Sequence, residues 1–435
     1  MRPYFLELKM NERDFVRRVI SVGGRVAVVG GWVRDFVRSE KPKDKDYVVS
    51  GLDEAIFCDV FPEVKRVGRA FPVFLAEIDG RGTEIALART ERKSGTGYRG
   101  FETWADGKVS LEEDLSRRDT TINAMAFELF SDGKEPLFLD PFGGQSDVKR
   151  GQIRAVSERF TEDPVRALRA SRQAALFGYD IEPRTLTLMG ECRDELLHEP
   201  GERIFGELAR ALEAPKPSAF FRWLLKANLL DAVFPEIFSL IGKIQPEAFH
   251  PEGDAFEHTM LVLDNVAQKT ENTVARFAAL VHDIGKGRTP DNMLPHHYGH
   301  EERGLDVLNR WNLRMIIPRL WRRTAEFVIK EHMRACRLKK PGKIAKLILN
   351  ISRLPILAKD VICVFEADNG KLPPYLSHYE SYLREILSVS GKDAPKSLRG
   401  EKIGEWVLGK QSMAVGVETA KWNRLAENEN LKPCR

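Results

Sequence analysis

The sequence predicts an α+β protein in which a domain built on a mixed sheet precedes a long, almost wholly helical region. In the first 140 residues, short valine-rich runs alternate with helical patterns. From about residue 147 onward, apolar residues recur at helical spacing and no segment shows the alternation typical of a strand. With 435 residues the chain exceeds the usual size of one domain, so we expect two to four packed units.

Local signals predict the first elements in order. Residues 25–31 (RVAVVGG) indicate a buried strand that ends in a tight turn, and WVRDFVR after it indicates a short helix. Residues 71–79 and 82–90 indicate two strands joined as a hairpin by Asp79, Gly80 and Arg81. These segments place a mixed sheet within residues 1–140.

The helical region is interrupted by the stretch QPEAFHPEGD at 245–254, which contains proline and glycine. Before it, VRALRASRQAALF and FRWLLKANLLDAVF have clear helical periodicity. We therefore expect four domains, at residues 1–140, 141–245, 246–365 and 366–435.

Composition excludes several classes of protein. The N-terminal stretch is charged and no run approaches the ~20 apolar residues that span a bilayer, so we expect no signal peptide and no membrane association. Five scattered cysteines without a CxxC pair indicate reduced thiols in a cytoplasmic protein. A net charge of +4 is mild, so charge is informative only locally. Two basic stretches fit either a phosphate-binding surface or a solvated helix face: Arg319, Arg322 and Arg323, then Arg334, Arg337, Lys339, Lys340, Lys343 and Lys346.

A first group of candidate site residues lies in GGWVRD (Gly30–Asp35) and in the DKD triplet that contains Asp44 and Asp46. Alternate residues of a strand point the same way, so the two aspartates would aim their carboxylates at one point. Such oxygen ligands suit Mg²⁺ bridged to substrate phosphates, and two ions about 4 Å apart would stabilise an in-line displacement. The glycines allow backbone N–H groups to approach a triphosphate, and Arg34 supplies a bidentate donor.

Two further segments add basic residues. In EDLSRRD, Arg118 either binds phosphate or forms an ion pair with Asp119 or Asp114. In TEDPVRALRASR, Asp163 and Pro164 indicate a helix start, and Arg166, Arg169 and Arg172 recur every three residues on one side of that helix. Cytosine and adenine both present an amino donor beside a ring-nitrogen acceptor, whereas uracil and guanine present the reverse. An Asp and Arg pair can therefore accept C and A and refuse U and G without a template.

In order and spacing, GGWVRD, DKD, ALARTERKSGTGYRGF, EEDLSRRDTTINAMAF, DPFGG and EDPVRALRASR resemble the motifs of class II CCA-adding tRNA nucleotidyltransferases. These belong to the polymerase-β-like superfamily, and the match is closest to the bacterial multifunctional CCA proteins with a C-terminal HD domain. The resemblance covers about the first 240 residues. It implies a catalytic head, a helical neck and body that select nucleotides and bind tRNA, an HD domain and a helical tail. One departure, FVRSEKPK where the family usually has a Leu-Leu-Gly step, alters a turn and no ligand.

The resemblance also implies roles for single residues, with tRNA, ATP and CTP as partners and Mg²⁺ as cofactor. The metal ligands would be Asp44 and Asp46, with Glu84 as a candidate third catalytic carboxylate. Asp163 and Arg166 would read the base. The remaining nucleotide-binding residues would be Gly31, Arg34, Arg118, Arg169 and Arg172.

A second group of site residues centres on HDIGKG, which begins at His282 and follows the apolar run RFAALV. Neighbouring histidines cluster around it, namely His250, His258, His296, His297, His300 and, farther on, His332. Imidazole and carboxylate together suit a borderline transition metal, which lowers the pKa of bound water for phosphoester hydrolysis.

This segment resembles HD-type phosphohydrolase domains through FHPEGDAFEHT, HDIGKG, HHYGH and FEAD. The resemblance implies His258, His282, Asp283 and Asp368 as metal ligands, with His297 and His300 as secondary candidates. It also implies a transition metal, with Ni²⁺ as one candidate, and phosphatase, 2′-nucleotidase and 2′,3′-cyclic phosphodiesterase activities.

Several alternatives remain open at this point. A CC-adding or A-adding specialist would share the same motifs, and a bacterial poly(A) polymerase is disfavoured by ALARTERKSG and the HD segment. An RNA-binding or chaperone protein with an inactive head is disfavoured by the intact pair Asp44 and Asp46. An HD-type nucleotide phosphohydrolase with a regulatory nucleotide-binding head is the remaining rival. The sequence is compatible with a monomer or a homodimer.

Overall fold

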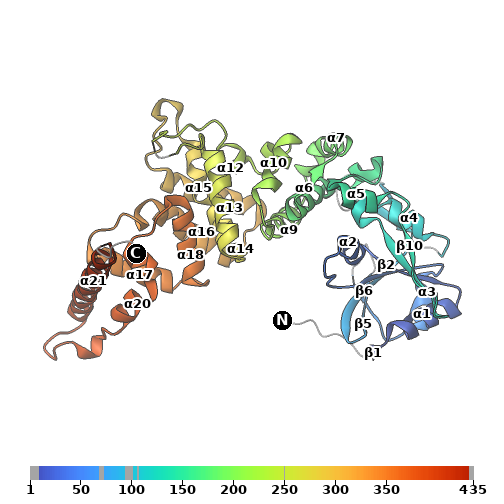
Figure 1. Cartoon of the computed structure of the whole chain (residues 1–435), viewed down its shortest axis with the longest axis horizontal. Helices are drawn as coiled ribbons and strands as arrows, with labels where there is room; N and C mark the ends of the chain where they lie inside the picture. The colour runs from blue at the N-terminus through green and yellow to red at the C-terminus, as the bar shows by residue number, and fades with distance from the viewer. Residues whose placement is uncertain (1–8, 68–72, 94–100, 105–106, 249, 431–435) are drawn as a thin grey trace. The chain divides into compact units, whose positions relative to one another are not determined.

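The computed structural model describes residues 9–67, 73–93, 101–104, 107–248 and 250–430 (Figure 1). Residues 71–72 of the first hairpin segment and residues 94–100 of ALARTERKSGTGYRGF lie outside these ranges. The chain forms two compact units, Met1–Ala211 with Ala219–Val233, and Leu212–Ser218 with Phe234–Arg435.

The main sheet lies in the first unit, and it is mixed as predicted. Its strand order is β1-β5-β6-β3-β2-β9-β10, with β4 paired to β5. The pairs β1–β5 and β3–β6 are parallel and the other pairs are antiparallel. Its strands are β1 (Lys9–Met10), β2 (Arg25–Val29), β3 (Asp46–Ser50), β4 (Lys65–Val67), β5 (Val73–Ile78), β6 (Arg81–Leu87), β9 (Ala126–Leu129) and β10 (Leu137–Leu139). Two separate two-stranded sheets consist of β7 (Thr90–Lys93) with β8 (Phe101–Trp104), and β11 (Gln152–Ile153) with β12 (Asp180–Ile181).

The predicted hairpin is confirmed. β5 and β6 pair antiparallel, and the turn residues Asp79 and Gly80 both have positive φ, at 51° and 72°. Two consecutive positive φ values match the right-handed twist of the strands, which explains the Asp-Gly pair at this position.

Both faces of the sheet are buried, which accounts for the continuous apolar run of β2. Val26 and Val28 belong to one core cluster, which also holds Phe15 of α1 and Phe57 of α3. Ala27 and Val29 point to the opposite cluster, which includes Leu111 and Leu115 of α4. The first eleven α-helices are α1 (Glu12–Ser21), α2 (Gly31–Val37), α3 (Glu54–Val60), α4 (Leu111–Ser116), α5 (Gly144–Arg150), α6 (Val165–Phe177), α7 (Pro183–Glu191), α8 (Arg193–Leu196), α9 (Gly201–Ala211), α10 (Ser218–Lys226) and α11 (Leu230–Val233).

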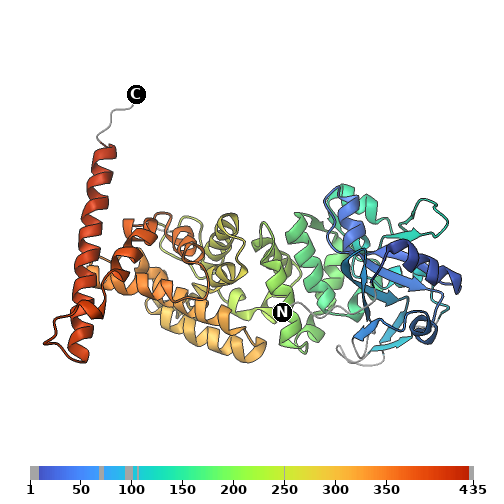
Figure 2. The same cartoon turned by 90° about the horizontal axis from the view of Figure 1, so that it is seen from below.

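Among its described residues, the regular elements of the second unit are all helices (Figure 2). Its core joins α13, α14, α16, α17 and α18 through fully buried side chains such as Val266, Ala278, Val328, Leu347 and Phe365. Its α-helices are α12 (Pro235–Phe238), α13 (Ala255–Lys269), α14 (Thr273–Val281), α15 (His300–Met315), α16 (Arg319–Ala335), α17 (Pro341–Ser352), α18 (Ala358–Asn369), α19 (Pro374–Ser377), α20 (Tyr379–Leu387) and α21 (Glu401–Asn430). The 3₁₀ helices of the chain are η1 (Thr121–Asn123), η2 (Glu158–Glu162), η3 (Ile284–Arg288), η4 (Asp291–Met293) and η5 (Gly391–Asp393).

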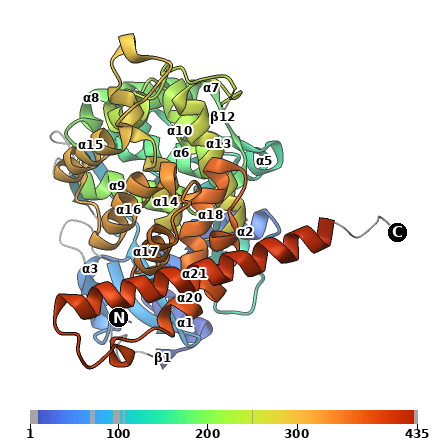
Figure 3. The same cartoon turned by 90° about the vertical axis from the view of Figure 1, so that its left-hand side faces the viewer.

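The long helix α21 lies against α17 and α20 (Figure 3). Val415 is fully buried there, and the Tyr382 hydroxyl donates to Thr419 at 3.1 Å. Within the described ranges, no helix is both long and apolar enough to cross a membrane. The four cysteines in those ranges are free, whereas Cys434 lies outside them.

The prediction that no strand follows residue 147 is wrong. β11 and β12 form a parallel pair in which Gln152 faces Asp180 and Ile153 faces Ile181. The antiparallel pair β7–β8 was not predicted either. A strand of two residues is too short to show a period in sequence. Its place depends on pairing with a strand that is distant along the chain.

Candidate functional site

The first candidate site is a cavity of about 790 Å³ in the first unit. Nine arginines and five carboxylates line it, so its wall carries an excess of positive charge that suits a polyanion such as a triphosphate. The lining residues are Gly30, Gly31, Arg34, Asp46, Glu84, Arg89, Arg117, Arg118, Asp119, Asn123, Asp163, Val165, Arg166, Arg169, Arg172, Arg203, Glu207 and Arg210.

Two carboxylates enter this cavity from neighbouring parallel strands. Asp46 opens β3 and is the register partner of Glu84 in β6. The Lys45 side chain is engaged elsewhere, since its ammonium pairs with Glu12 at 2.7 Å and lies 5.1 Å from the Trp32 ring centroid. Desolvation, and then the Glu84 and Asp44 carboxylates, raise the pKa of Asp46 to about 6. A cation between these carboxylates would relieve their repulsion.

Asp44 lies in a different setting from the one predicted. β3 begins at Asp46, so Asp44 lies two residues before the strand, in the segment 41–45 that has no regular structure, and Asp44 is exposed. The strand-alternation argument is therefore wrong for Asp44, which is also not among the residues that line the cavity. Its carboxylate is still near enough to raise the pKa of Asp46.

The two glycines bring the chain close to arginines. Gly30 has φ +70°, and a Cβ there would lie 3.3 Å from Arg118 Nη1. Gly31 begins α2, whose Arg34 donates to Asp35 and Asn123 and stacks over Phe177. Arg118 faces the cavity and pairs with Asp114 at 3.2 Å, which is one of the two ion pairs that the sequence left open.

Helix α6 brings the predicted arginines to the same cavity, but each has a partner. Arg169 pairs with the buried Asp119 at 2.7 Å, and Arg172 pairs with Glu207 at 2.6 Å. The Arg166 side chain donates to the carbonyls of Arg159 and Arg117, both at 2.7 Å. Each of these two Arg166 bonds uses one N–H of its guanidinium, which has five N–H donors in all.

The predicted base-reading carboxylate is held by a residue that sequence reasoning missed. Asp163 accepts from the backbone of Val165 at 3.2 Å, just before α6 begins. Both of its carboxylate oxygens lie 3.1 Å from Arg203 Nη2, and Arg203 also pairs with the buried Glu199 at 2.6 Å. The signal that could have revealed Arg203 is the charged face of GERIFGELAR, on which Arg203, Glu207 and Arg210 recur at helical spacing.

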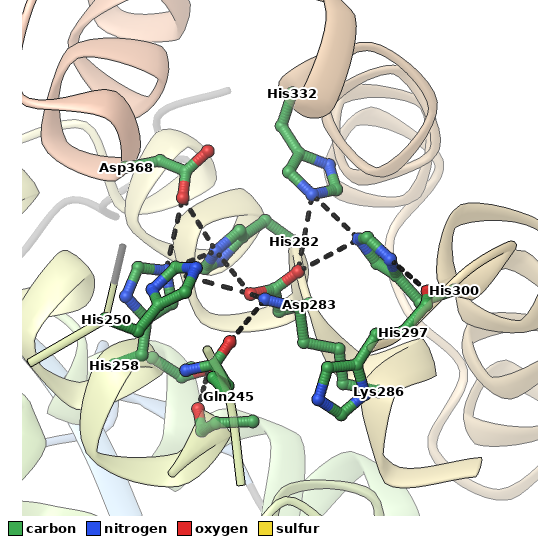
Figure 4. Close-up of polar contacts among 12 residues, drawn as sticks. Gln245, His250, His258, His282, Asp283, Lys286, His297, His300, His332 and Asp368 are labelled. Atoms are coloured by element: carbon green, nitrogen blue, oxygen red, sulfur yellow. Dashed lines mark hydrogen bonds and ion pairs between the residues drawn. The ribbon is translucent and has the colours of Figure 1, made fainter. Parts of the chain in front are cut away.

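The second candidate site lies in the second unit, where four histidines and two aspartates converge (Figure 4). α13 supplies His258, the end of α14 supplies His282 and Asp283, and α18 supplies Asp368. These are the four predicted metal ligands, and the structure brings them together. His258 Nε2 lies 3.1 Å from Asp368 Oδ1, and His282 Nε2 lies 3.2 Å from Asp283 Oδ2.

Of the two secondary candidates, His300 belongs to the cluster and His297 does not. His300 faces Asp283, with Nε2 3.2 Å from Oδ1. His297 does not take part, because its two ring nitrogens contact Thr289 and the Ile244 carbonyl. Burial lowers the pKa of His297 to about 4, so it is neutral at pH 7. The resemblance does not imply a ligand role for His332 of α16, yet its Nε2 lies 3.3 Å from Asp283 Oδ1.

Neighbouring opposite charges stabilise one another in this cluster. Burial opposes the charge of Asp283, but the Lys286 ammonium, 2.5 Å away, holds the pKa of that carboxyl well below its usual range. Burial likewise opposes a charge on His282, yet the Asp283 carboxylate raises the pKa of His282 to about 10. A cation, whether a proton or a metal ion, is therefore favoured between these groups.

Three family models match the chain. The model described as "Poly A polymerase head domain" matches residues 26–154, and the one described as "Probable RNA and SrmB- binding site of polymerase A" matches residues 178–241. The model described as "HD domain" matches residues 255–369.

Known proteins match along most of the chain. The Multifunctional CCA protein of Nitrosococcus oceani is 40% identical over 404 residues, which cover 90% of this chain and 97% of that protein. The Multifunctional CCA protein of Mannheimia succiniciproducens is 41% identical over 381 residues, 83% of this chain and 88% of that protein. The solved structure of the Bacillus stearothermophilus CCA-adding enzyme in complex with CTP matches with a TM-score of 0.64 and 22% identity, covering 96% of this chain and 98% of that one. This last likeness concerns the fold.

Proposed function

This chain belongs to the multifunctional CCA proteins, as its motifs predicted, and on that premise we propose that it builds and repairs the 3′-terminal CCA of tRNA from CTP and ATP. One observation carries the proposal. The carboxylates Asp46 and Glu84 line the same cavity as Asp163 and the arginines of α6. A single cavity therefore combines groups for metal-assisted phosphoryl transfer with groups for selecting a base.

The residues present fit magnesium, because Asp46 and Glu84 offer adjacent hard oxygen ligands and Asp44 adds a third carboxylate nearby. Bound Mg²⁺ would neutralise charge on the triphosphate and favour attack of the RNA 3′-hydroxyl on the α-phosphate, with pyrophosphate leaving. The protein's own groups bind and orient the substrate. Arg34, Arg118, Arg169 and Arg172 supply donors for the phosphates and sugar, and the turn at Gly30 and Gly31 leaves room for close backbone approach.

For base selection we assign Asp163 as the acceptor for the exocyclic amine of C or A, and Arg166 as the donor to the adjacent ring nitrogen. The rigid placement of both groups supports this assignment, since Arg203 holds Asp163 and two carbonyls hold Arg166. Uracil and guanine would leave these partly buried groups unpaired, at a cost of about 1–3 kcal/mol for each unpaired group.

The test is incubation of the purified full-length chain with Mg²⁺, each nucleoside triphosphate and a tRNA that lacks the three terminal nucleotides. We expect incorporation of CMP and none of UMP or GMP. Failure of a well-folded sample to incorporate CMP would refute the proposal. A tRNA that already ends in CC separates the alternatives, since a CC-adding specialist adds nothing to it and an A-adding specialist extends only this substrate.

The histidine–aspartate cluster supports a second activity, hydrolysis of phosphoesters. We propose that the HD domain uses a transition-metal ion, with Ni²⁺ as one candidate, on phosphomonoesters, 2′-nucleotides and 2′,3′-cyclic phosphates. The supporting observation is a set of four ligand-type side chains from three helices: the buried His258, His282 and Asp283, and the largely buried Asp368. Such hydrolysis would convert damaged RNA 3′ ends into the free hydroxyl that nucleotide addition requires.

This second proposal is tested with RNA that ends in a 2′,3′-cyclic phosphate. After loading with Ni²⁺, we expect the full-length chain to open and remove that group, and the His282→Ala variant to be inactive. Equal activity of that variant would show that the cluster is not the hydrolytic site. Hydrolysis of free nucleotides alone, with no nucleotide transfer by the same sample, would favour the regulatory-head alternative.

A further inference from the structure

Lys45 lies between the two aspartates of the DKD triplet, and three side chains hold it in place. Its ammonium lies 2.7 Å from Glu12 Oε1 and 5.1 Å from the centroid of the Trp32 ring. Its backbone carbonyl accepts a hydrogen bond of 2.8 Å from the Thr83 hydroxyl. Both the side chain and the backbone of Lys45 are therefore fixed by residues outside the triplet.

The Glu12 carboxylate also holds a second residue on the same side of the chain. The Tyr47 hydroxyl donates to the same Oε1 atom that pairs with Lys45. Residues two apart in a strand point to the same face, so Lys45 continues the alternation of β3 one residue before that strand begins. Asp46 points to the opposite face, where it lines the cavity.

Glu12 stands on a firmly packed element. It is the first residue of α1, whose Phe15, Val16 and Val19 belong to the core cluster beneath the sheet, with no more than 2% of each exposed. The Phe15 ring meets the Tyr47 ring edge-on, with centroids 5.4 Å apart. A group on a rigid element can position its partner more precisely than a group on a loop.

Thr83 joins Lys45 to the strand that carries the third carboxylate. Thr83 is buried and directly precedes Glu84 in β6. β6 pairs in parallel with β3, and Glu84 is the register partner of Asp46. The bond from Thr83 to the Lys45 carbonyl therefore extends the link between these strands by one residue toward Asp44.

Asp44 is the carboxylate that depends most on this support. It is exposed and lies in the segment 41–45, which has no regular structure. It is joined to β3 through Lys45, so the position of Lys45 limits where the Asp44 carboxylate can lie. Asp44 and Asp46 also repel one another, and a fixed Lys45 opposes their separation.

We propose that Glu12 is a positioning residue of the nucleotidyl-transfer site. It holds the Lys45 side chain while Thr83 holds the Lys45 carbonyl, and the Asp44 carboxylate is thereby kept beside Asp46 for the same divalent ion. The functional meaning of this inference rests on the proposed nucleotide transfer. Replacement of a residue that orients metal ligands typically weakens metal affinity about 10- to 100-fold.

Metal affinity in the absence of RNA tests the inference apart from catalysis. The full-length chain with His282→Ala, which weakens ion binding by the histidine–aspartate cluster, is treated with chelator and titrated with Mn²⁺, with and without CTP. Electron paramagnetic resonance measures free Mn²⁺, and a titration without protein corrects for ions bound by CTP alone. For the binding that requires CTP, we expect Glu12→Gln to raise the Mn²⁺ Kd about tenfold.

A double-substitution cycle distinguishes an effect that passes through Lys45 from a general loss of structure. Lys45→Met should raise the Kd about as much as Glu12→Gln, and the double variant should raise it no further. The matched control is Asp14→Asn, which removes an ion pair of 2.6 Å between Asp14 and Arg17 on the same helix and should leave the Kd unchanged. Circular dichroism with thermal melting identifies any variant that has not folded.

In nucleotide transfer, Glu12→Gln should lower kcat/KM for CTP at limiting Mg²⁺, and excess Mg²⁺ should restore it. An unchanged Mn²⁺ Kd in folded Glu12→Gln, or a further loss of affinity in the double variant, would overturn the inference. If the parent still adds CMP, the proposed nucleotide transfer survives that result. A tenfold weaker Kd in Glu12→Gln, together with no addition of CMP by the parent, would support the inference and contradict the proposed function. A parent chain without any CTP-dependent Mn²⁺ binding would contradict both.

Discussion

At the scale of single residues, Arg203 controls the group to which we assign base reading. Its Nη2 lies 3.1 Å from each oxygen of Asp163, and Nη1 lies 2.6 Å from Glu199. We expect Arg203→Met to free the Asp163 carboxylate and leave Glu199 buried without its cation. The preference for CTP over UTP, measured as the ratio of kcat/KM values, should fall about tenfold.

Arg210→Met is the control for this prediction. Arg210 lines the same cavity, but its side chain is 52% exposed and it pairs with Glu207 rather than Asp163. Its replacement should change KM for both nucleotides alike and leave the ratio unchanged. An unchanged ratio in Arg203→Met as well would mean that Arg203 serves stability alone.

The pKa of Asp46 makes the metal requirement depend on pH. Because desolvation and the Glu84 carboxylate raise that pKa to about 6, the protonated form competes with Mg²⁺ as the pH falls through 6. We expect the Mg²⁺ concentration needed for half-maximal nucleotide transfer to rise between pH 7 and pH 5, and excess Mg²⁺ to restore activity. A requirement that stays constant over this range would contradict the shifted pKa.

The free energy of unfolding should also depend on pH, because the pKa of Asp46 is raised in the folded chain. A carboxyl pKa that is higher in the folded than in the unfolded chain favours folding at low pH, and this contribution is lost as the pH rises through about 6. Asp46→Asn cannot ionise. The metal-free variant should therefore melt at a higher temperature than the parent at pH 8, with the difference disappearing below about pH 4.

Residues close to a motif could be predicted from the sequence, and residues far from one could not. Asp46 and Glu84 were predicted, as were His258, His282, Asp283 and Asp368, and the structure brings each group together. Arg203 lies 40 residues from Asp163, and His332 lies 32 residues from His300. Only the packing of their helices reveals such neighbours. Conversely, His297 stands beside a motif but turns toward Thr289 and Ile244.

At the scale of elements, Gly285 allows η3 to lie directly against α15. A Cβ at this position would lie 1.9 Å from the His300 carbonyl and 2.5 Å from Gly304 N, and these are backbone atoms that cannot turn aside. Gly285→Ala should therefore displace the start of α15, which carries His300. We expect a loss of about 3 kcal/mol in the free energy of unfolding and weaker metal binding.

Gly409→Ala serves as the matched control for Gly285→Ala. Gly409 lies within α21, and a Cβ there would meet nothing within 4 Å outside the helix's own backbone. This change should leave metal binding unaltered and raise stability by up to about 1 kcal/mol, since alanine favours helix more than glycine does. Denaturant unfolding measures the stability of both variants, and metal titration measures their metal binding. Equal stability of Gly285→Ala and the parent would contradict the close contact between η3 and α15.

Element type was predictable where the chain carries a long period or a turn signal. The Asp-Gly turn between β5 and β6 and the helix after Asp163 are examples. Helix α6 begins at Val165, one residue later than its proline suggested. The pairs β7–β8 and β11–β12 escaped prediction because short strands are specified by their partners and not by their own sequence.

At the scale of the whole molecule, the two candidate sites belong to different compact units. A substitution in one site should therefore remove the activity of that site and leave the activity of the other site unchanged. We expect Asp46→Ala to reduce nucleotide transfer at least about a hundredfold and to leave hydrolysis of cyclic phosphates unchanged. His282→Ala should have the reverse effect. Loss of both activities in either folded variant would show that the two sites are coupled.

The most direct measurement is the mass of a tRNA 3′ end after incubation with this chain, Mg²⁺ and all four nucleoside triphosphates. Starting from tRNA without its terminal triplet, we expect a product heavier by two cytidylates and one adenylate, with no further extension. An unextended end, a tail of repeated adenylates, or incorporation of uridylate would contradict template-independent CCA addition in the cavity formed by Asp46, Glu84 and α6.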